Sequence, residues 1–507
     1  MPSPQVTKIP PSSFVSRDHH GPQQNASANI PGRIKPRYFK NPWPSYRTAS
    51  LKDAYQAYQR GAAIALHPSR LRGVAKLEGK QDSDADDSEY ELEPAWTESD
   101  SIMPKKIYVR PEFARVGSGD EREDWRDPPV EVVEPTWGDG SDGREKVTWL
   151  GHAGVLIQIP WKTSENPDNK RNGTCGILFD PIFSYRCSPT QYAGPARYID
   201  SPCTVSMLPE IHACCISHDH YDHLDYYTIM DLWKYHQSTI HFFVPMGLKQ
   251  WFTSSGIPAF RVTELDWWHE TVLTFSETPD FDYDPHYPPE EPEDALNKTP
   301  NLHTPSALAL KIVFTPAQHR SGRGVLDHMT TLWGSWCVGV VEDADREYAL
   351  EPGMKDWKGF KAYFGGDTGY RYATAPEEDD SAICPAFQRI GDLYGPFTFA
   401  MLPLSTGSSL PFLRTVLSLS LDQYLLTSSL HCSPADSLEI HRVIQSQRTL
   451  GIHWGTFCDA DEARGTRVEF GRSRRAVGVS RDWEAEEARN GRFVIADIGE
   501  TLTMPAR

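Results

Sequence analysis

The sequence predicts a layered domain of the α/β or α+β class, in which strands and helices share one large core. Short apolar runs of strand length alternate with segments of helical pattern, an order that is typical of layered folds. The chain has 507 residues, of which 39% are hydrophobic. This is enough apolar material for a sizeable core, and the length favours one core with insertions or a tail.

The expected strands are bounded by polar residues or by turn residues. They cover residues 147–159, 176–181, 212–217, 241–245, 307–319, 361–368, 398–403 and 450–457. A short helix is expected to begin at Met246. A longer helix should run from Ser433 to about Gln447. Its start is well marked, because Ser433 can cap the helix, Pro434 suits the first helical position and Asp436 can complete a capping box.

The domain organisation follows from shifts in composition. Residues 1–36 are rich in Pro, Ser, Asn and Gln, and we expect them to be disordered. Residues 37–127 form an N-terminal extension that includes an acidic linker at 81–100. Within it, residues 51–76 have a basic, partly helical pattern. That helix either lies on an anionic membrane or packs against the main domain, which we place at 128–507.

Acidic residues account for the net charge of −18 and are concentrated in two stretches. One is the linker at 81–100 and the other is an insertion at 275–305, and both are interpreted as solvated surface loops. The rest of the chain is nearly neutral. No basic surface signature for nucleic-acid binding is present, so we expect no nucleic-acid partner.

Cysteine usage and hydropathy indicate the compartment. The nine cysteines are scattered, apart from Cys214-Cys215, and an odd number without a secretory leader argues against a disulfide framework. No window approaches the roughly 18 apolar residues of a membrane span. We therefore expect an intracellular protein that is cytoplasmic or peripherally associated with a membrane. A homodimer is compatible with these observations.

The strongest chemical signal is the hexapeptide HDHYDH at residues 218–223, which directly follows an apolar strand. On an extended segment His218 and His220 face the same way, so both can bind one ion. The chain then turns, which lets Asp222 and His223 address a second ion. Imidazole and carboxylate ligands at this density suit a divalent metal such as zinc better than a simple hydrogen-bonded turn.

A two-metal site needs further ligands, and each should lie at the end of a strand. His319, Asp367 and His453 all do so. Asp367 is preceded by two glycines, which allow the backbone to approach closely. A single histidine at such a position is more often a structural residue than a metal ligand. Because residues 218–223 already supply a cluster of ligands, metal binding is the favoured interpretation of these histidines.

A family resemblance is carried by motifs spread over about residues 37–460. They are TWLGHA (148–153), DPIFS (180–184), SPTQYAGP (188–195), ISHDHYDHLD (216–225), ELDWW (264–268), FTPAQH (314–319), LWGSW (332–336), FGGDTGY (364–370) and IHWGTF (452–457), with NPWP (41–44) as a lead-in. The chain resembles hydrolases of the metallo-β-lactamase fold. It resembles more closely the N-acyl-phosphatidylethanolamine-hydrolysing phospholipase D family, because the paired tryptophans and the 180–195 run go beyond generic metallohydrolase motifs.

The resemblance implies an αβ/βα sandwich with two zinc ions. One ion would be held by His218, His220 and His319, the other by Asp222, His223 and His453, and Asp367 would bridge both. The implied reaction is hydrolysis of the distal phosphodiester of N-acyl-phosphatidylethanolamine at a membrane surface, which yields phosphatidic acid and an N-acylethanolamine. Asp222 and Asp367 would be catalytic.

Two other residues have roles implied by position. His431 matches a family histidine near the metals, and we assign it to phosphate contact or to protonation of the leaving group. An exposed histidine before a helix is the alternative. Tyr221 is interpreted as a substrate contact or as a packing residue.

The chain departs from the family pattern before its last predicted helix. The residue before His431 is Leu430 in place of the usual Gln, and an insertion occupies 405–430. Its apolar part, 405–426, is interpreted as an amphipathic lid or membrane-docking element, or else as a helix in the core. Two other functions stay open: a metallo-lactonase or related hydrolase of small metabolites, and a non-catalytic membrane-associated scaffold.

Overall fold

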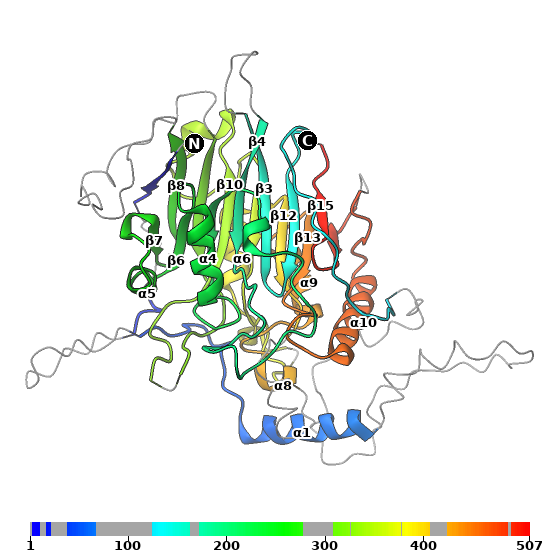
Figure 1. Cartoon of the computed structure of the whole chain (residues 1–507). Coiled ribbons are helices and arrows are strands. Elements are labelled where there is room, and N and C mark those ends of the chain that lie inside the picture. The colour runs from blue at the N-terminus through cyan, green and yellow to red at the C-terminus, as the bar shows by residue number, and fades with distance from the viewer. Residues whose placement is uncertain are drawn as a thin grey trace, which may run out of the picture.

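The computed structural model describes most of the chain. The described residues are 3–10, 17–21, 38–66, 124–162, 172–276, 308–324, 326–376, 378–405, 423–484 and 488–506. Two sheets, one of eight and one of seven strands, lie face to face at the centre of the molecule, with helices on their outer sides (Figure 1). The fold is therefore a four-layered α+β sandwich, as the sequence predicts.

The seven-stranded sheet contains most of the N-terminal half of the main domain. Its order is β15 (Thr501–Thr503), β2 (Lys146–Gly151), β3 (Gly154–Lys162), β4 (Asn172–Phe179), β5 (Ile211–Cys215), β6 (His241–Pro245) and β7 (Val262–Leu265). The four strands from β4 to β7 are mutually parallel. Their carboxyl ends therefore meet at one edge of the sheet.

The eight-stranded sheet is built in the same way. Its order is β1 (Ser3–Lys8), β8 (His269–Ser276), β9 (Ala309–Thr315), β10 (Ser335–Val340), β11 (Lys361–Phe364), β12 (Phe399–Pro403), β13 (Arg448–Ile452) and β14 (Arg492–Val494). The strands from β11 to β14 are parallel. Parallel strands bury both faces, which agrees with their nearly continuous apolar sequences.

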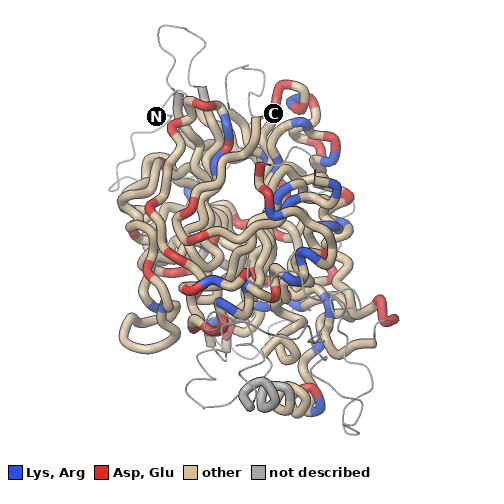
Figure 2. Tube along the Cα trace, turned by 90° about the vertical axis from the view of Figure 1, so that its right-hand side faces the viewer, with Lys and Arg blue, Asp and Glu red and all other residues tan. Residues whose placement is uncertain are grey.

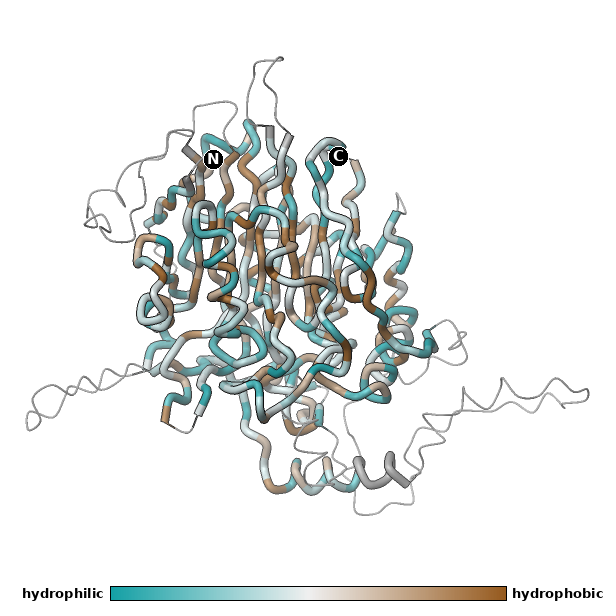
Figure 3. The backbone as a smooth tube through the Cα atoms, in the orientation of Figure 1, coloured by the Kyte–Doolittle hydropathy of each residue, from teal (hydrophilic) through white to brown (hydrophobic). Residues whose placement is uncertain are grey.

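The core lies between the two sheets. Phe179 of β4 stacks on Phe364 of β11 with ring centroids 4.9 Å apart, and both rings are completely buried. Figure 3 shows that hydrophobic residues lie along the central strands and hydrophilic residues in the outer loops. Full burial of one such side chain contributes about 1.5–3 kcal/mol, so this interface stabilises the arrangement of both sheets.

The helices cover the sheets and the edge at which the parallel strands end. They are α1 (Leu51–Leu66), α4 (Tyr226–His236), α5 (Lys249–Ser254), α6 (Ala386–Tyr394), α8 (Gln423–Thr427), α9 (Pro434–Val443) and α10 (Ala460–Ala476), with 3₁₀ turns at Val205–Met207, Ala259–Arg261, Asp343–Tyr348 and Asp380–Ala382. The predicted capping box of α9 is present, with Ser433 and Asp436 bonded reciprocally. This helix ends at Val443, earlier than the expected Gln447.

Two predicted elements are divided by turns. The run at 147–159 is a hairpin, β2–β3, because Gly151 has a φ of 96° and reverses the chain. The helix expected from Met246 begins only at Lys249. A turn at Gly247 (φ 98°) precedes the helix, and the backbone N–H of Gly247 donates a hydrogen bond to the carboxylate of Glu264.

The described parts of the N-terminal region lie against the main domain. β1 pairs antiparallel with β8, and His19 is buried beside Asp266. For these residues the structure differs from the disorder expected of 1–36; residues 11–16 and 22–37 lie outside the described residues. Pairing with a sheet edge supplies hydrogen bonds that composition alone does not reveal.

The helix predicted within 51–76 packs on the main domain. Ala57 of α1 is completely buried against Ala373 and Leu425, and α1 lies below the sheets beside α8 (Figure 1). The acidic linker 81–100, residues 277–307 of the acidic insertion and residues 406–422 of the second insertion lie outside the described residues. The predicted domain boundaries at 37 and 128 stay predictions.

In the described part of the chain, no helix is both long and apolar enough to cross a membrane. Lys and Arg positions alternate with Asp and Glu positions over the side shown in Figure 2.

Candidate metal centre

The predicted ligands meet at the edge where the parallel strands end. β5 leads into residues 218–223, β11 into Asp367 and β13 into His453, while His319 follows β9. The β2–β3 turn brings a further side chain, His152, to the same place. Since parallel strands end together, residues more than two hundred positions apart become neighbours.

One cluster consists of His218, His220, His319 and Asp367, whose potential ligand atoms all lie within 4.8 Å of one another. The Nδ1 atom of His220 lies 2.9 Å from Nε2 of His218 and 3.3 Å from Nε2 of His319. The Oδ2 atom of Asp367 lies 4.0 Å from His218 Nε2 and 3.7 Å from His319 Nε2. These three histidines are the ones predicted for the first ion.

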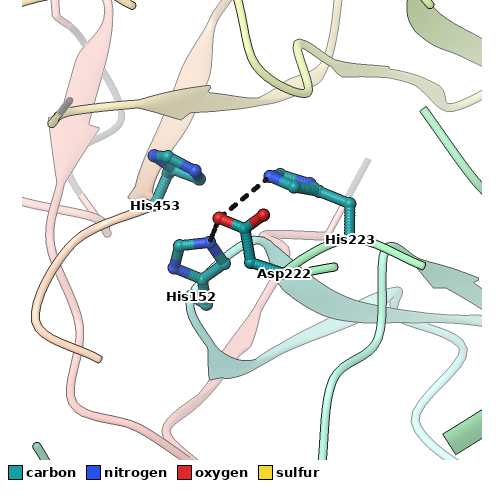
Figure 4. A group of neighbouring side chains, drawn as sticks. All are labelled: His152, Asp222, His223 and His453. Atoms are coloured by element: carbon teal, nitrogen blue, oxygen red, sulfur yellow. Dashed lines mark hydrogen bonds and ion pairs between the residues drawn. The ribbon is translucent and has the colours of Figure 1, made fainter. Parts of the chain in front are cut away.

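The second cluster consists of His152, Asp222, His223 and His453 (Figure 4). The Oδ2 atom of Asp222 lies 3.1 Å from Nε2 of His152 and 3.9 Å from Nε2 of His223. The rings of His152 and His453 are 4.2 Å apart. Three members were predicted for the second ion, and His152 is an addition from the structure.

Asp367 lies between the two clusters. Its Oδ1 atom is 2.8 Å from Nε2 of His453, and its Oδ2 atom is 3.3 Å from Nε2 of His223. The same Oδ2 atom faces the three histidines of the first cluster. This is the arrangement expected of a carboxylate that bridges two ions.

Outer contacts fix the orientation of the ligand rings. The Nδ1 atom of His223 donates to Asp180 at 2.7 Å, and Nδ1 of His319 donates to the carbonyl oxygen of Leu430 at 2.9 Å. The Nδ1 atom of His218 lies 2.8 Å from the hydroxyl of Ser217. Each of these rings therefore directs Nε2 inward, as histidines held by a second layer of hydrogen bonds do in metal sites.

The backbone is strained at several of these residues. His152, Asp180 and His453 have φ angles of 52°, 36° and 60°. Such conformations cost about 1–3 kcal/mol each in a residue other than glycine and persist only where the surroundings determine them. Here the strain accompanies side chains that point into one centre, which indicates a functional site.

The carboxylates of the centre are held ionised. Burial alone would raise the pKa of Asp222 and of Asp367, but the adjacent His223 holds both pKa values well below their usual range. Burial would likewise lower the pKa of His223, but the carboxylates of Asp367 and Asp222 raise it well above its usual value. A proton on His223 thus balances these buried anions, and a metal ion bound at its Nε2 would take the place of that proton.

Four other histidines of the centre have lowered pKa values and are therefore held neutral. Burial lowers the pKa of His218 and of His319 well below the usual value, and it also lowers that of His220. Burial and the neighbouring His453 lower the pKa of His152 to about 3. Neutral imidazoles with ionised carboxylates are the protonation states that metal binding requires.

The residues present fit divalent metal ions. Among the described residues, several buried polar atoms at the centre make no hydrogen bond, including Nε2 of His223, Nε2 of His453 and Oδ1 of Asp367. The last two atoms lie 2.8 Å apart but outside hydrogen-bond geometry. Buried polar atoms without a partner are rare in proteins, because they lose the hydration of the unfolded chain. Imidazole and carboxylate donors at these separations suit zinc or a similar ion.

The two predicted substrate residues differ in position. His431 lies at the centre: its Nδ1 is 3.7 Å from Oδ2 of Asp367, and its ring stacks 5.8 Å from that of His453. Tyr221 instead packs against the cluster of Ile182, Cys187 and Phe457, with the guanidinium of Arg323 4.4 Å from its ring centroid. Its contacts are those of the packing alternative, and substrate contact stays a prediction.

The N-terminal lead-in supports the centre from outside. Asn41 donates to the carbonyl oxygen of His319 at 2.7 Å, and Trp43 stacks 5.3 Å from Trp267. Sequence reasoning assigned no role to Asn41, His152 or Asp180. All three residues lie within the motifs that carry the family resemblance, and membership of a motif was the signal that could have identified them. The spacing of the motifs along the chain does not show which side chains these residues contact.

The chain is similar to several known proteins. The family described as the β-lactamase superfamily domain matches residues 176–454. N-acyl-phosphatidylethanolamine-hydrolyzing phospholipase D 1 of Caenorhabditis elegans is 28% identical over 359 residues, which are 70% of this chain and 74% of that protein. The mitochondrial N-acyl-phosphatidylethanolamine-hydrolyzing phospholipase D of Saccharomyces cerevisiae is 26% identical over 348 residues, 64% of this chain and 58% of that protein. Among solved structures, Igni18, a metallo hydrolase from Ignicoccus hospitalis, matches with a TM-score of 0.36 and 14% identity over 72% of this chain and 99% of its own.

Proposed function

Since this chain belongs to the β-lactamase superfamily and is a metal-dependent hydrolase, we propose that it is a zinc-dependent phosphodiesterase acting on N-acyl-phosphatidylethanolamine. The products are phosphatidic acid and an N-acylethanolamine. Two relatives from different organisms carry this activity in their names. The motifs shared with that family include the paired Trp267 and Trp268, which generic metallohydrolase motifs lack.

The observation that carries the proposal is the position of Asp367 between two clusters of ligands. When bound there, two divalent ions would lower the pKa of water towards neutrality and neutralise charge on phosphoryl oxygens. His218, His220 and His319 would hold one ion, and Asp222, His223 and His453 the other. Asp367 faces both groups, so the attacking and the leaving oxygen of an in-line displacement would lie at one centre.

His431 supplies the proposed contact with the phosphate. Burial lowers the pKa of His431 to about 4, so the ring is neutral at physiological pH and retains a single N–H. Its side chain is 13% exposed, more than those of Asp367 and His453. A neutral imidazole at the mouth of the centre donates a hydrogen bond to a phosphoryl oxygen and orients the scissile bond.

A phospholipid substrate requires contact with a lipid surface, and we place this contact on α1. Leu51, Tyr55 and Tyr58 are 92%, 54% and 51% exposed, and their spacing puts them on one face of the helix. The opposite face is anchored, since Asp53 accepts a hydrogen bond from the hydroxyl of Tyr372 at 2.9 Å. An exposed apolar face beside the end of the molecule that bears the metal centre suits the interface of a membrane.

A product assay tests the proposal. The full chain, loaded with zinc, is incubated with N-acyl-phosphatidylethanolamine in detergent, and products are identified by mass spectrometry. Equal amounts of phosphatidic acid and N-acylethanolamine are expected. Turnover of a lactone panel without lipid cleavage would support a soluble metallo-lactonase instead, and metal binding without turnover of any substrate would support a scaffold.

A further inference from the structure

A second cavity lies at the opposite end of the strands from the metal centre. Its volume is about 550 Å³, and it is lined by the C-terminal part of α9, the start of β13 and residues 488–492. Ligand sites of proteins typically enclose roughly 300–1,000 Å³. β13 begins in this wall and ends just before His453, so about 16 Å of strand separates the two sites at 3.3 Å per residue.

The cavity is strongly basic. Among the described residues, its walls carry four arginines and one glutamate: Arg442, Arg448, Arg489, Arg492 and Glu439. The glutamate is already engaged, because Glu439 accepts a hydrogen bond from Arg442 at 2.8 Å. An excess of positive charge therefore faces the cavity.

Two of these arginines are buried side by side. Arg448 of β13 and Arg492 of β14 are partners in the parallel register, and they are only 7% and 5% exposed. Neighbouring strands lie about 4.8 Å apart, and paired positions project to the same face of the sheet. Burial and the charge of Arg492 together lower the pKa of Arg448. Two buried like charges at this separation repel each other unless an anion lies between them.

The described part of the chain provides no such anion for Arg448. Its Nε donates to the carbonyl oxygen of Trp483 at 3.3 Å, and its guanidinium lies 5.8 Å from the centroid of that ring. No ion pair within 4.0 Å reaches it from the described residues, although the charge of the exposed Glu484 opposes the fall of its pKa. The Nε atom of Arg448 is thus engaged, and Arg448 is among the residues that line the cavity.

We propose that this cavity binds a small molecule carrying a phosphate group, with Arg448 and Arg492 on the phosphate oxygens and Arg489 at the mouth. A phosphate presents several acceptor oxygens and about two negative charges, which match two guanidinium forks better than a single carboxylate does. The cavity is large enough to hold further atoms of the ligand besides its phosphate group. This site is independent of the metal chemistry, so its failure would leave the proposed hydrolase function untouched.

Calorimetry on the zinc-loaded full chain tests the proposal, with inorganic phosphate as the first probe. All variants retain the metal centre, so phosphate binding at the cavity is measured as the difference in binding between each variant and the wild type. The wild type should show one saturable site more than R448Q/R492Q. R144Q, which changes an exposed arginine that does not line the cavity, should bind like the wild type.

Two milder variants keep the test valid if R448Q/R492Q does not fold. R448K keeps the charge but not the fork, and R489Q alters only an exposed side chain; both should weaken binding, R489Q by about threefold, as expected for an exposed ion pair. Glycerol 3-phosphate and a short-chain phosphatidic acid then distinguish a soluble ligand from a lipid headgroup by which binds more tightly. Equal phosphate binding by the wild type, R448K and R489Q would overturn the proposal, as would a site retained in folded R448Q/R492Q.

Discussion

The carboxylate of Asp180 joins the two ligand clusters, because it binds His223 directly and His218 through one intervening residue. Its Oδ2 atom accepts from Nδ1 of His223 at 2.7 Å and from the hydroxyl of Ser217 at 2.5 Å. That hydroxyl lies 2.8 Å from Nδ1 of His218. A single buried carboxyl group thus orients one ligand for each predicted ion.

Replacement of Asp180 by Asn should weaken metal binding without removing a ligand. An amide cannot accept as strongly from His223, and loss of such an outer contact typically costs about 10–100-fold in metal affinity or activity. Zinc affinity by competition with a chromophoric chelator is the measurement. Asp225→Asn is the matched control, since Asp225 is also buried but caps α4. Unchanged zinc affinity in D180N would contradict the role assigned to Asp180.

Asp367→Asn should abolish most of the hydrolysis while the fold is retained. It removes one negative charge that both clusters face, and we expect activity to fall by at least about a hundredfold, in the range seen when an electrostatic contribution to catalysis is lost. Steady-state assays, metal analysis and circular dichroism check this together. Asp461, whose side chain is 85% exposed, provides the control D461N. Near-normal turnover with two bound metals in D367N would exclude a bridging role.

His152→Asn should act on the second cluster alone. Asn tolerates the left-handed backbone that His152 adopts, so the substitution removes the contact with Asp222 but little backbone stability. We expect metal content to fall towards one ion per chain, with His218, His220 and His319 still occupied. Equilibrium dialysis followed by elemental analysis measures this. Two tightly bound ions in H152N would show that the imidazole is not needed there.

Asp266→Asn should release the N-terminal segment that His19 and His20 hold. Burial alone would raise the pKa of Asp266, but the hydrogen bond from His19 and the nearby His20 keep it below its usual range. A lowered pKa stabilises the folded state above the ordinary pKa of about 3.9, and this contribution is lost as the pH falls through the lowered value.

The expected loss for D266N is about 1.5–3 kcal/mol at neutral pH, the range for hydrogen bonds to a charged group. Urea unfolding should show the full difference from the wild type at pH 7 and a smaller one below pH 4. D343N, at an 80% exposed side chain, should show neither effect. A difference that does not change with pH would count against the ionised pairing.

The triple variant L51S/Y55S/Y58S should reduce binding to vesicles of anionic phospholipid. The substitutions remove exposed apolar surface from α1 and leave Asp53 and Ala57, its inner contacts, in place. Hydrolysis of detergent-dispersed substrate should be unchanged, because the metal centre is untouched. Vesicle flotation measures the binding, with Y235S/Y348S as a control at similarly exposed tyrosines. Equal flotation of both variants would exclude α1 as the docking face.

The sequence by itself determined the class of fold and the residues most suited to bind metal. Strand-length apolar runs that end in His or Asp predicted the sheet layers and the metal ligands. Both predictions succeed because the hydrophobic pattern of a strand and the residues at its end are visible in a short stretch of sequence. The prediction of an α+β sandwich of the metallo-β-lactamase type is confirmed, and the seven proposed ligands meet at one edge of the two sheets.

Only the tertiary structure decided which side chains support those ligands. Asp180 reaches His223 across 43 positions, and Asn41 reaches His319 across 278. The place of α1 on α8 and the pairing of Arg448 with Arg492 depend in the same way on packing and register between distant segments. A sequence pattern records what each residue can do, whereas contacts over such distances depend on how the whole chain closes around its core.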